Sequence, residues 1–90
     1  MIEILVTAEF EKRYSDLPVL IQKKAERQEK FFKENPFYPS LHTEKLEPRA
    51  KKLWSFRVDK NYRVVFRFFA GSKVLLLTVG KHDWIYRIHF

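Results

Sequence analysis

The sequence predicts an α+β fold: a small, mostly antiparallel four-stranded sheet with two N-terminal helices packed on one face, in the order strand, helix, helix, strand, strand, strand. The apolar residues recur at helical spacing before residue 35 and at every second position from Leu53 onward. Ninety residues, 46% of them hydrophobic, suit one domain over 1–90. Two Gly, four Pro and short apolar runs argue against a disordered or membrane-spanning chain.

Three elements are expected in the first half of the chain. Alternating apolar residues predict a strand over 2–7, and 8–15 reads as a short helix. A second helix restarts at Asp16, with Pro18 in its first turn, and ends at Asn35 before Pro36. The apolar stripe of this helix, which we expect to cover the sheet, is Leu17, Leu20, Ile21, Ala25, Phe31 and Phe32.

The second half predicts a three-stranded meander after a loop over 37–52. Its strands are expected over 53–58, 62–69 and 73–79, the last nearly all apolar and central. A three-residue turn at 59–61 would pair Val58 with Tyr62, and therefore Arg57 with Arg63. Like charges directly opposite destabilise a sheet. An anion such as a phosphate would compensate them; alternatively, both side chains diverge into water.

Positive charge is concentrated in the second half. Residues 1–48 carry eight basic and nine acidic side chains, a net of −1, whereas 49–90 carry ten basic and two acidic ones, a net of +8. Such asymmetry suits a polyanionic partner, although a solubilising surface has the same composition.

Few other residues in the sequence could take part in catalysis or bind a metal or cofactor. His82 and Tyr86 are four residues apart, so helical or turn geometry would bring them to one side, although a lone histidine is more often structural. Glu44 by itself reads as an exposed carboxylate beside a lysine. The chain has no cysteine and no phosphate-binding glycine loop, so we expect no cofactor. His42, His82, Asp83 and His89 lack paired-ligand spacing, so we expect no metal.

Three motifs in this order resemble the RelE/ParE toxin superfamily of toxin-antitoxin systems over nearly the whole chain. They are Leu53-Trp-Ser-Phe-Arg-Val58, Asn61-Tyr-Arg-Val-Val-Phe66, and Thr78-Val-Gly-Lys-His-Asp83 continuing to Tyr86. The resemblance implies a toxin that cleaves messenger RNA on the ribosome, inhibits translation and is neutralised by a cognate antitoxin. It implies a metal-free attack by the ribose 2′-hydroxyl. A cytoplasmic location is expected because the first residues, MIEILVT, carry no basic signal-peptide region, and the short apolar runs predict no membrane partner.

The resemblance also implies roles for single residues. Arg57 and Arg63 would surround the scissile phosphate, His82 would be the proton donor and Glu44 the base. Tyr86 falls at the terminal aromatic position. The further basic residues expected to bind RNA are Lys51, Lys52, Arg67 and Lys81.

One departure affects the mechanism. Some RelE-type enzymes carry lysines where this chain has Ser55 and Arg57, which shifts the role of base toward Glu44. Two alternatives stay open: a non-enzymatic DNA gyrase inhibitor like ParE, and a catalytically inactive RNA-binding relative.

Overall fold

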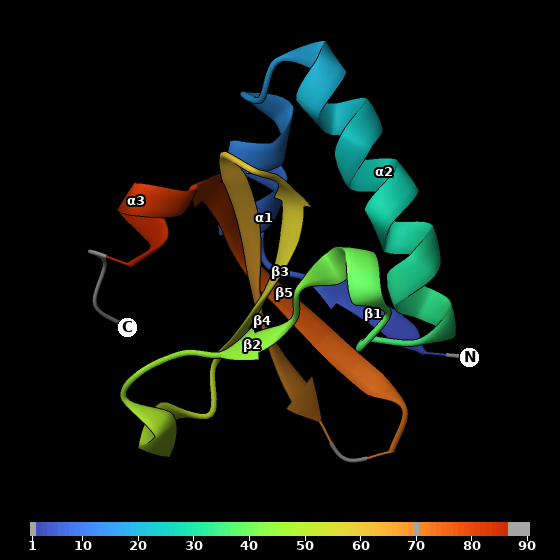
Figure 1. Cartoon of the computed structure of the whole chain (residues 1–90), viewed down its shortest axis with the longest axis vertical. Coiled ribbons are helices and arrows are strands. Elements are labelled where there is room, and N and C mark those ends of the chain that lie inside the picture. Colours follow the sequence, from blue (N-terminus) through green and yellow to red (C-terminus); the bar gives the residue numbers. More distant parts are fainter. Residues whose placement is uncertain (1, 70, 87–90) are drawn as a thin grey trace.

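The computed structural model of the chain describes residues 2–69 and 71–86, which form one five-stranded sheet flanked by helices (Figure 1). Within these residues the spatial order of the strands is β1-β5-β4-β3-β2. Strands β1 and β5 pair in parallel, and the other neighbours are antiparallel. The strands are β1 (Glu3–Val6), β2 (Glu44–Lys45), β3 (Trp54–Asp59), β4 (Tyr62–Phe69) and β5 (Lys73–Lys81). The helices are α1 (Ala8–Ser15), α2 (Val19–Glu34) and α3 (His82–Ile85), with 3-10 turns η1 (Pro39–Leu41) and η2 (Arg49–Lys51).

The predicted α+β class and the mostly antiparallel sheet are confirmed, but the described sheet has five strands rather than four. The additional strand, β2, pairs Glu44 with Ser55 and Lys45 with Trp54. Two residues are too few to show an alternating pattern, so this segment read as loop. Its position at the edge of the sheet brings Glu44 beside β3.

The two predicted helices are present. Helix α1 begins after Thr7, whose hydroxyl accepts a hydrogen bond from the amide of Phe10 at 3.0 Å. Helix α2 begins one residue after Pro18, so Pro18 precedes the helix instead of lying in its first turn. The proline has extended backbone angles there, and its carbonyl accepts from the amide of Gln22. The helix ends before Asn35, as predicted.

Helix α2 contributes a narrower apolar stripe than the sequence predicted. Ile21, Ala25 and Phe32 are buried against the sheet, and the ring of Phe32 lies 4.7 Å from that of Phe56. Leu20, by contrast, is 65% exposed. Its predicted place relied on its spacing from Leu17, which lies before the helix begins, so helical geometry does not relate the two.

The β3–β4 hairpin has the predicted pairing of Arg57 with Arg63 but a tighter end. Tyr62 pairs with Asp59 and not with Val58, which forms a bulge, and the turn is the two residues 60–61. The Asp59 carboxylate accepts from the amides of Asn61 and Tyr62 at 2.8 and 3.0 Å. These bonds favour the short turn over the predicted three-residue one.

The two faces of the sheet have different covers. Helix α2 packs on the face that carries Phe56, Val64 and Phe66. The other face carries Arg57 and Arg63, and we call it the open face. A smaller apolar cluster lies there under α3: Leu46, Leu53, Val65 and Ile85. Figure 1 shows α2 and α3 on opposite sides of the strands. In 2–69 and 71–86 no helix is long and apolar enough to cross a membrane.

Candidate active site on the open face

Arg57 and Arg63 lie directly opposite each other on the open face. Burial lowers the pKa of the Arg63 guanidinium, as does the nearby positive charge of Arg57, while the carboxylate of Glu44 acts in the opposite direction. One guanidinium nitrogen of Arg63 lies 3.5 Å from the carbonyl oxygen of His42. Its buried Nε has no hydrogen-bond partner among the described residues. The pair therefore presents positive charge whose hydrogen-bonding capacity is only partly used.

Strand β2 places Glu44 on the same face. Its partner Ser55 is two residues before Arg57, and paired residues share a face of the sheet. The carboxylate of Glu44 accepts a hydrogen bond from the hydroxyl of Tyr86. The structure thus brings together a carboxylate, two guanidinium groups and a phenol that come from four separate segments of the chain.

Helix α3 supplies the histidine of this group. It follows β5 without a linker, and the amide of His82 donates to the carbonyl of Asn61 at 2.7 Å, which fixes the start of the helix to the hairpin turn. The rings of His82 and Tyr86 lie 4.6 Å apart, as their spacing of four residues predicts. His82 Nδ1 lies 3.6 Å from the Asp83 carboxylate, an ion pair when the imidazole is protonated.

Trp84, and Arg13 from another helix, hold α3 on the sheet. Trp84 covers Gly80: a Cβ on this glycine would lie only 2.4 Å from Cε3 of the indole. The guanidinium of Arg13, from α1, lies over the indole ring at 4.3 Å from its centroid. A glycine inside a strand often marks a close approach of this kind, which is the signal that could have found it.

The predicted RNA-binding residues do not form one patch. Arg67 lies exposed on the open face, four residues along β4 from Arg63. Lys51 and Lys52 are exposed in and after η2. Lys81 pairs with Tyr62, so it lies on the sheet face opposite to Arg63. Lys81 lines, with His82 and Tyr62, a groove of 430 Å³ at the hairpin end.

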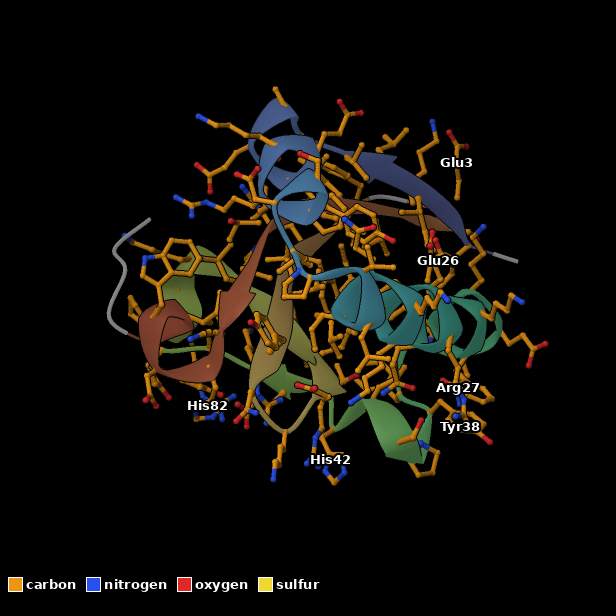
Figure 2. All side chains as sticks on the ribbon, turned by 90° about the horizontal axis from the view of Figure 1, so that it is seen from above. Glu3, Glu26, Arg27, Tyr38, His42 and His82 are labelled. Atoms are coloured by element: carbon orange, nitrogen blue, oxygen red, sulfur yellow. The ribbon has the colours of Figure 1, made fainter. Side chains whose placement is uncertain are left out.

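The two histidines that the structure describes come from different segments. Figure 2 shows His82 on α3 and His42 on a separate segment. Across residues 2–69 and 71–86, no three His, Asp or Glu side chains are grouped so that they could hold a metal ion. His89, considered above as a ligand, lies outside the described residues.

The fold agrees with a family match. The model of the HigB-like toxins, described as the RelE-like toxin of the type II toxin-antitoxin system HigB, matches residues 9–82. The match spans most of the chain, so the chain belongs to this family of RelE-like toxins. The resemblance expected from the three motifs is confirmed. No curated protein matches the sequence.

Several solved structures share the fold. The YoeB/ParE toxin from Agrobacterium tumefaciens superposes with a TM-score of 0.74 at 19% identity, over 90% of this chain and 99% of the other. YafQ from E. coli gives 0.70 at 14%, over 96% and 99%. The chain matched in the RelB-RelE antitoxin-toxin complex from Methanococcus jannaschii gives 0.71 at 20%, over 91% and 94%. At such identities the likeness establishes the fold alone.

Proposed function

We propose that the chain is a ribosome-dependent mRNA endoribonuclease, the toxin of a type II toxin-antitoxin system. The observation that carries this proposal is the Arg57–Arg63 pair, with Glu44 beside it and with a buried Arg63 Nε that has no partner in 2–69 and 71–86. Two arginine side chains at directly opposite strand positions suit a phosphate, whose oxygens accept bidentate hydrogen bonds from guanidinium groups. Membership of the RelE-like toxin family also supports a toxin function.

In the proposed reaction, Glu44 takes the proton from a ribose 2′-hydroxyl. The 2′-oxygen then forms a bond to the adjacent phosphorus, and the bond from phosphorus to the 5′-oxygen breaks. Arg57 and Arg63 stabilise the added negative charge on the phosphate oxygens in the transition state. A protonated His82 transfers its proton to the departing 5′-oxygen. The products are a 2′,3′-cyclic phosphate and a 5′-hydroxyl, so DNA, which has no 2′-hydroxyl, would not be cut.

Tyr86 can contribute in two ways. The residue is 48% exposed and its ring adjoins that of His82, so a base can stack on it. Its hydroxyl donates to Glu44 and thereby orients the carboxylate. We assign stacking as the main role, and positioning of Glu44 as the second.

The remaining assignments follow from charge and family. Arg67, Lys51 and Lys52 would contact RNA or ribosomal phosphates, and Lys81 would do so from the hairpin end. A substrate on the ribosome places the activity in the cytoplasm. Related structures are complexes of toxin with antitoxin, such as YoeB-YefM from Staphylococcus aureus. We propose a cognate antitoxin for this chain as well.

The deciding experiment is primer extension on an mRNA incubated with purified ribosomes and the protein. The wild-type chain should give discrete cuts only when ribosomes are present. His82→Ala should lower the cleavage rate about 10²-fold or more, since a general acid contributes about that much.

The matched control is His42→Asn. His42 contacts Arg63 through its backbone carbonyl and has a left-handed φ of 46°, which asparagine tolerates. This variant should cleave within a few-fold of the wild type. Equal loss in both variants would remove His82 from the mechanism. No cleavage by the wild type on active ribosomes would overturn the proposal, and inhibition of DNA gyrase supercoiling would then identify the ParE-like alternative.

A further inference from the structure

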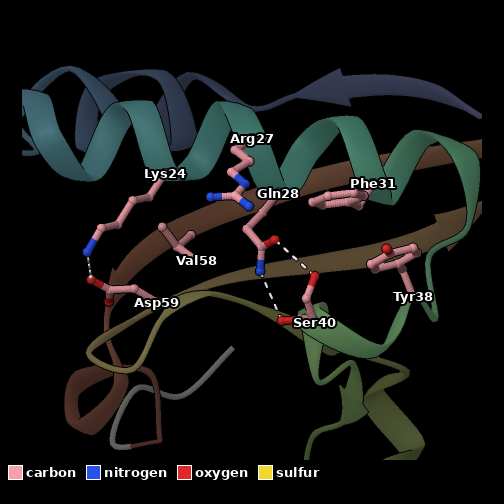
Figure 3. A pocket seen from close by; sticks show the side chains of 8 residues that line it. All are labelled: Lys24, Arg27, Gln28, Phe31, Tyr38, Ser40, Val58 and Asp59. Atoms are coloured by element: carbon pink, nitrogen blue, oxygen red, sulfur yellow. Dashed lines mark hydrogen bonds and ion pairs between the residues drawn. The ribbon is translucent and has the colours of Figure 1, made fainter.

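The side chain of Gln28 connects α2 to two segments that carry the proposed active site. Its amide nitrogen donates to the carbonyl of Arg57 at 2.8 Å and to the carbonyl of Ser40 at 3.0 Å. Its amide oxygen accepts from the hydroxyl of Ser40 at 3.2 Å. Figure 3 shows the amide between the helix and Ser40. Both amide hydrogens and the oxygen are therefore used.

The carbonyl of Arg57 lies where β3 lacks a neighbouring strand. Within the described residues, β2 pairs with β3 at Trp54 and Ser55 only. Val58 then bulges out of register with β4. A bulged strand beyond the end of its edge partner would leave backbone groups unpaired. The side-chain amide of Gln28 donates to the Arg57 carbonyl the hydrogen bond that a neighbouring strand would otherwise donate.

The second bonded carbonyl belongs to the segment that leads into β2. Ser40 lies in η1, four residues before Glu44, and His42 in the same segment offers its carbonyl to Arg63. The hydroxyl of Thr43 donates to the carbonyl of Pro36, so the loop is fixed at both ends. Gln28 thus fixes, from one helix position, the strand of Arg57 and the loop before Glu44.

We propose that Gln28 is a positioning residue of the active site: its two donated hydrogen bonds set the distance between Glu44 and the Arg57–Arg63 pair. Gln28 lies on the α2 side of the sheet and cannot itself reach an RNA on the open face. The inference rests on the proposed nuclease function for its kinetic consequence. The claim that the hydrogen bonds of Gln28 fix the loop before Glu44 does not depend on that function.

Three variants separate the donated bonds from the rest of the side chain. Gln28→Met keeps length and removes every polar bond. Gln28→Glu keeps the shape and the acceptor for Ser40 but donates no hydrogen bond when ionised. Ser40→Ala is the matched control, because it removes the hydroxyl bond and leaves both donated bonds intact.

The first measurement is single-turnover cleavage with the protein in excess over ribosome-bound mRNA, in which the rate constant at saturating protein does not depend on the fraction of folded enzyme. Both Gln28 variants should lower this rate constant about tenfold or more, as expected for misplaced groups. The protein concentration for half-maximal rate should change less than twofold, and Ser40→Ala should match the wild type. A Gln28→Glu variant as fast as the wild type would overturn the proposal.

The second measurement is amide hydrogen exchange, which tests the proposal without any cleavage. In Gln28→Met, exchange at Leu41, His42 and Leu46 should become about tenfold faster or more. The amide of Tyr86, bonded to the carbonyl of His82, should be unchanged. Unchanged exchange in the loop would overturn the positioning role even if cleavage fell. If the wild type cleaved nothing, the proposed function would fail and this arm would still decide about Gln28.

Discussion

Arg57 and Arg63 occupy directly opposite positions on β3 and β4, immediately before the bulge at Val58. Direct cross-strand pairing of like charges costs a few tenths of a kcal/mol or more. The buried Nε of Arg63, unpartnered among the described residues, adds a desolvation cost. Both costs lower the stability of the protein.

Replacement of Arg63 should separate activity from stability. Arg63→Met should reduce cleavage about 10²-fold, because one donor to the transition state is lost. The same change should raise the free energy of unfolding by a few tenths of a kcal/mol or more, because burial of the charged guanidinium and its repulsion from Arg57 both end, and together they outweigh the attraction to Glu44 that is lost. Urea unfolding and primer extension measure the two effects.

The control for this prediction is Arg67→Met. Arg67 is on the same strand and face but lies opposite Leu75, so the change should leave stability nearly unaffected. If Arg63→Met were less stable than Arg67→Met, the repulsion argument would be contradicted.

The sequence predicted the arginine pairing because two features decide which residues of a hairpin face each other on one side of the sheet. These are the alternation of side chains along each strand and the length of the turn. Changing the loop from three residues to two was compensated by the bulge at Val58, so the predicted pair survived an error in the turn. The contact between His82 and Tyr86 was predictable for a similar reason, since residues four apart share a side of one helical turn.

Contacts between distant segments were not predictable in this way. Glu44 reaches Tyr86 through a two-residue strand that has no periodic signal, and Gln28 reaches Arg57 from another element. The packing of Trp84 on Gly80 depends on how α3 folds back over the sheet, which local spacing does not determine. Such relationships arise from tertiary packing.

Variants at Tyr86 should distinguish stacking from positioning. Tyr86→Phe keeps the ring and removes the hydrogen bond to Glu44, so single-turnover cleavage should fall less than tenfold. Tyr86→Ala also removes the stacking surface, which contributes about 1–3 kcal/mol per base, so cleavage should fall about tenfold further or more. Equal losses in the two variants would show that the hydroxyl group matters more than the ring. Orientation of Glu44 would then be the main role of Tyr86.

A methyl group at Gly80 should displace α3. The Cβ of Gly80→Ala would lie 2.4 and 2.7 Å from two atoms of the Trp84 ring, and Arg13 covers that ring. Overpacking of this kind costs about 1–3 kcal/mol, which urea unfolding would detect. His82 and Tyr86 would shift with the helix, so cleavage should also fall.

A double-mutant cycle tests whether the indole is the cause. In a Trp84→Leu background the ring is absent, so Gly80→Ala should cost less than half as much as in the wild type. Additive free energies in the cycle would show that Gly80 is needed for some reason other than its contact with Trp84.

Tyr14 should make the stability of the helical layer depend on alkaline pH. Its hydroxyl donates to the carbonyl of Gln22 at 3.2 Å and to Glu26 at 3.3 Å. Burial raises the pKa of Tyr14 above its usual value, and the charge of Glu26 raises it further. A group whose pKa is raised on folding contributes its full stability below the unfolded pKa, about 10, and loses it as the pH rises through the folded pKa.

Tyr14→Phe should therefore destabilise the protein by about 1 kcal/mol near pH 8, and the difference from the wild type should shrink toward about pH 11. Urea unfolding of both proteins at the two pH values measures this, and titration of lysines cancels in the comparison. Glu26→Gln should weaken the pH dependence, because it removes a charge that raises the pKa of Tyr14. A difference between wild type and Tyr14→Phe that stays constant or grows with pH would show that the phenol ionises at least as readily in the folded chain as in the unfolded one, which would contradict the raised pKa.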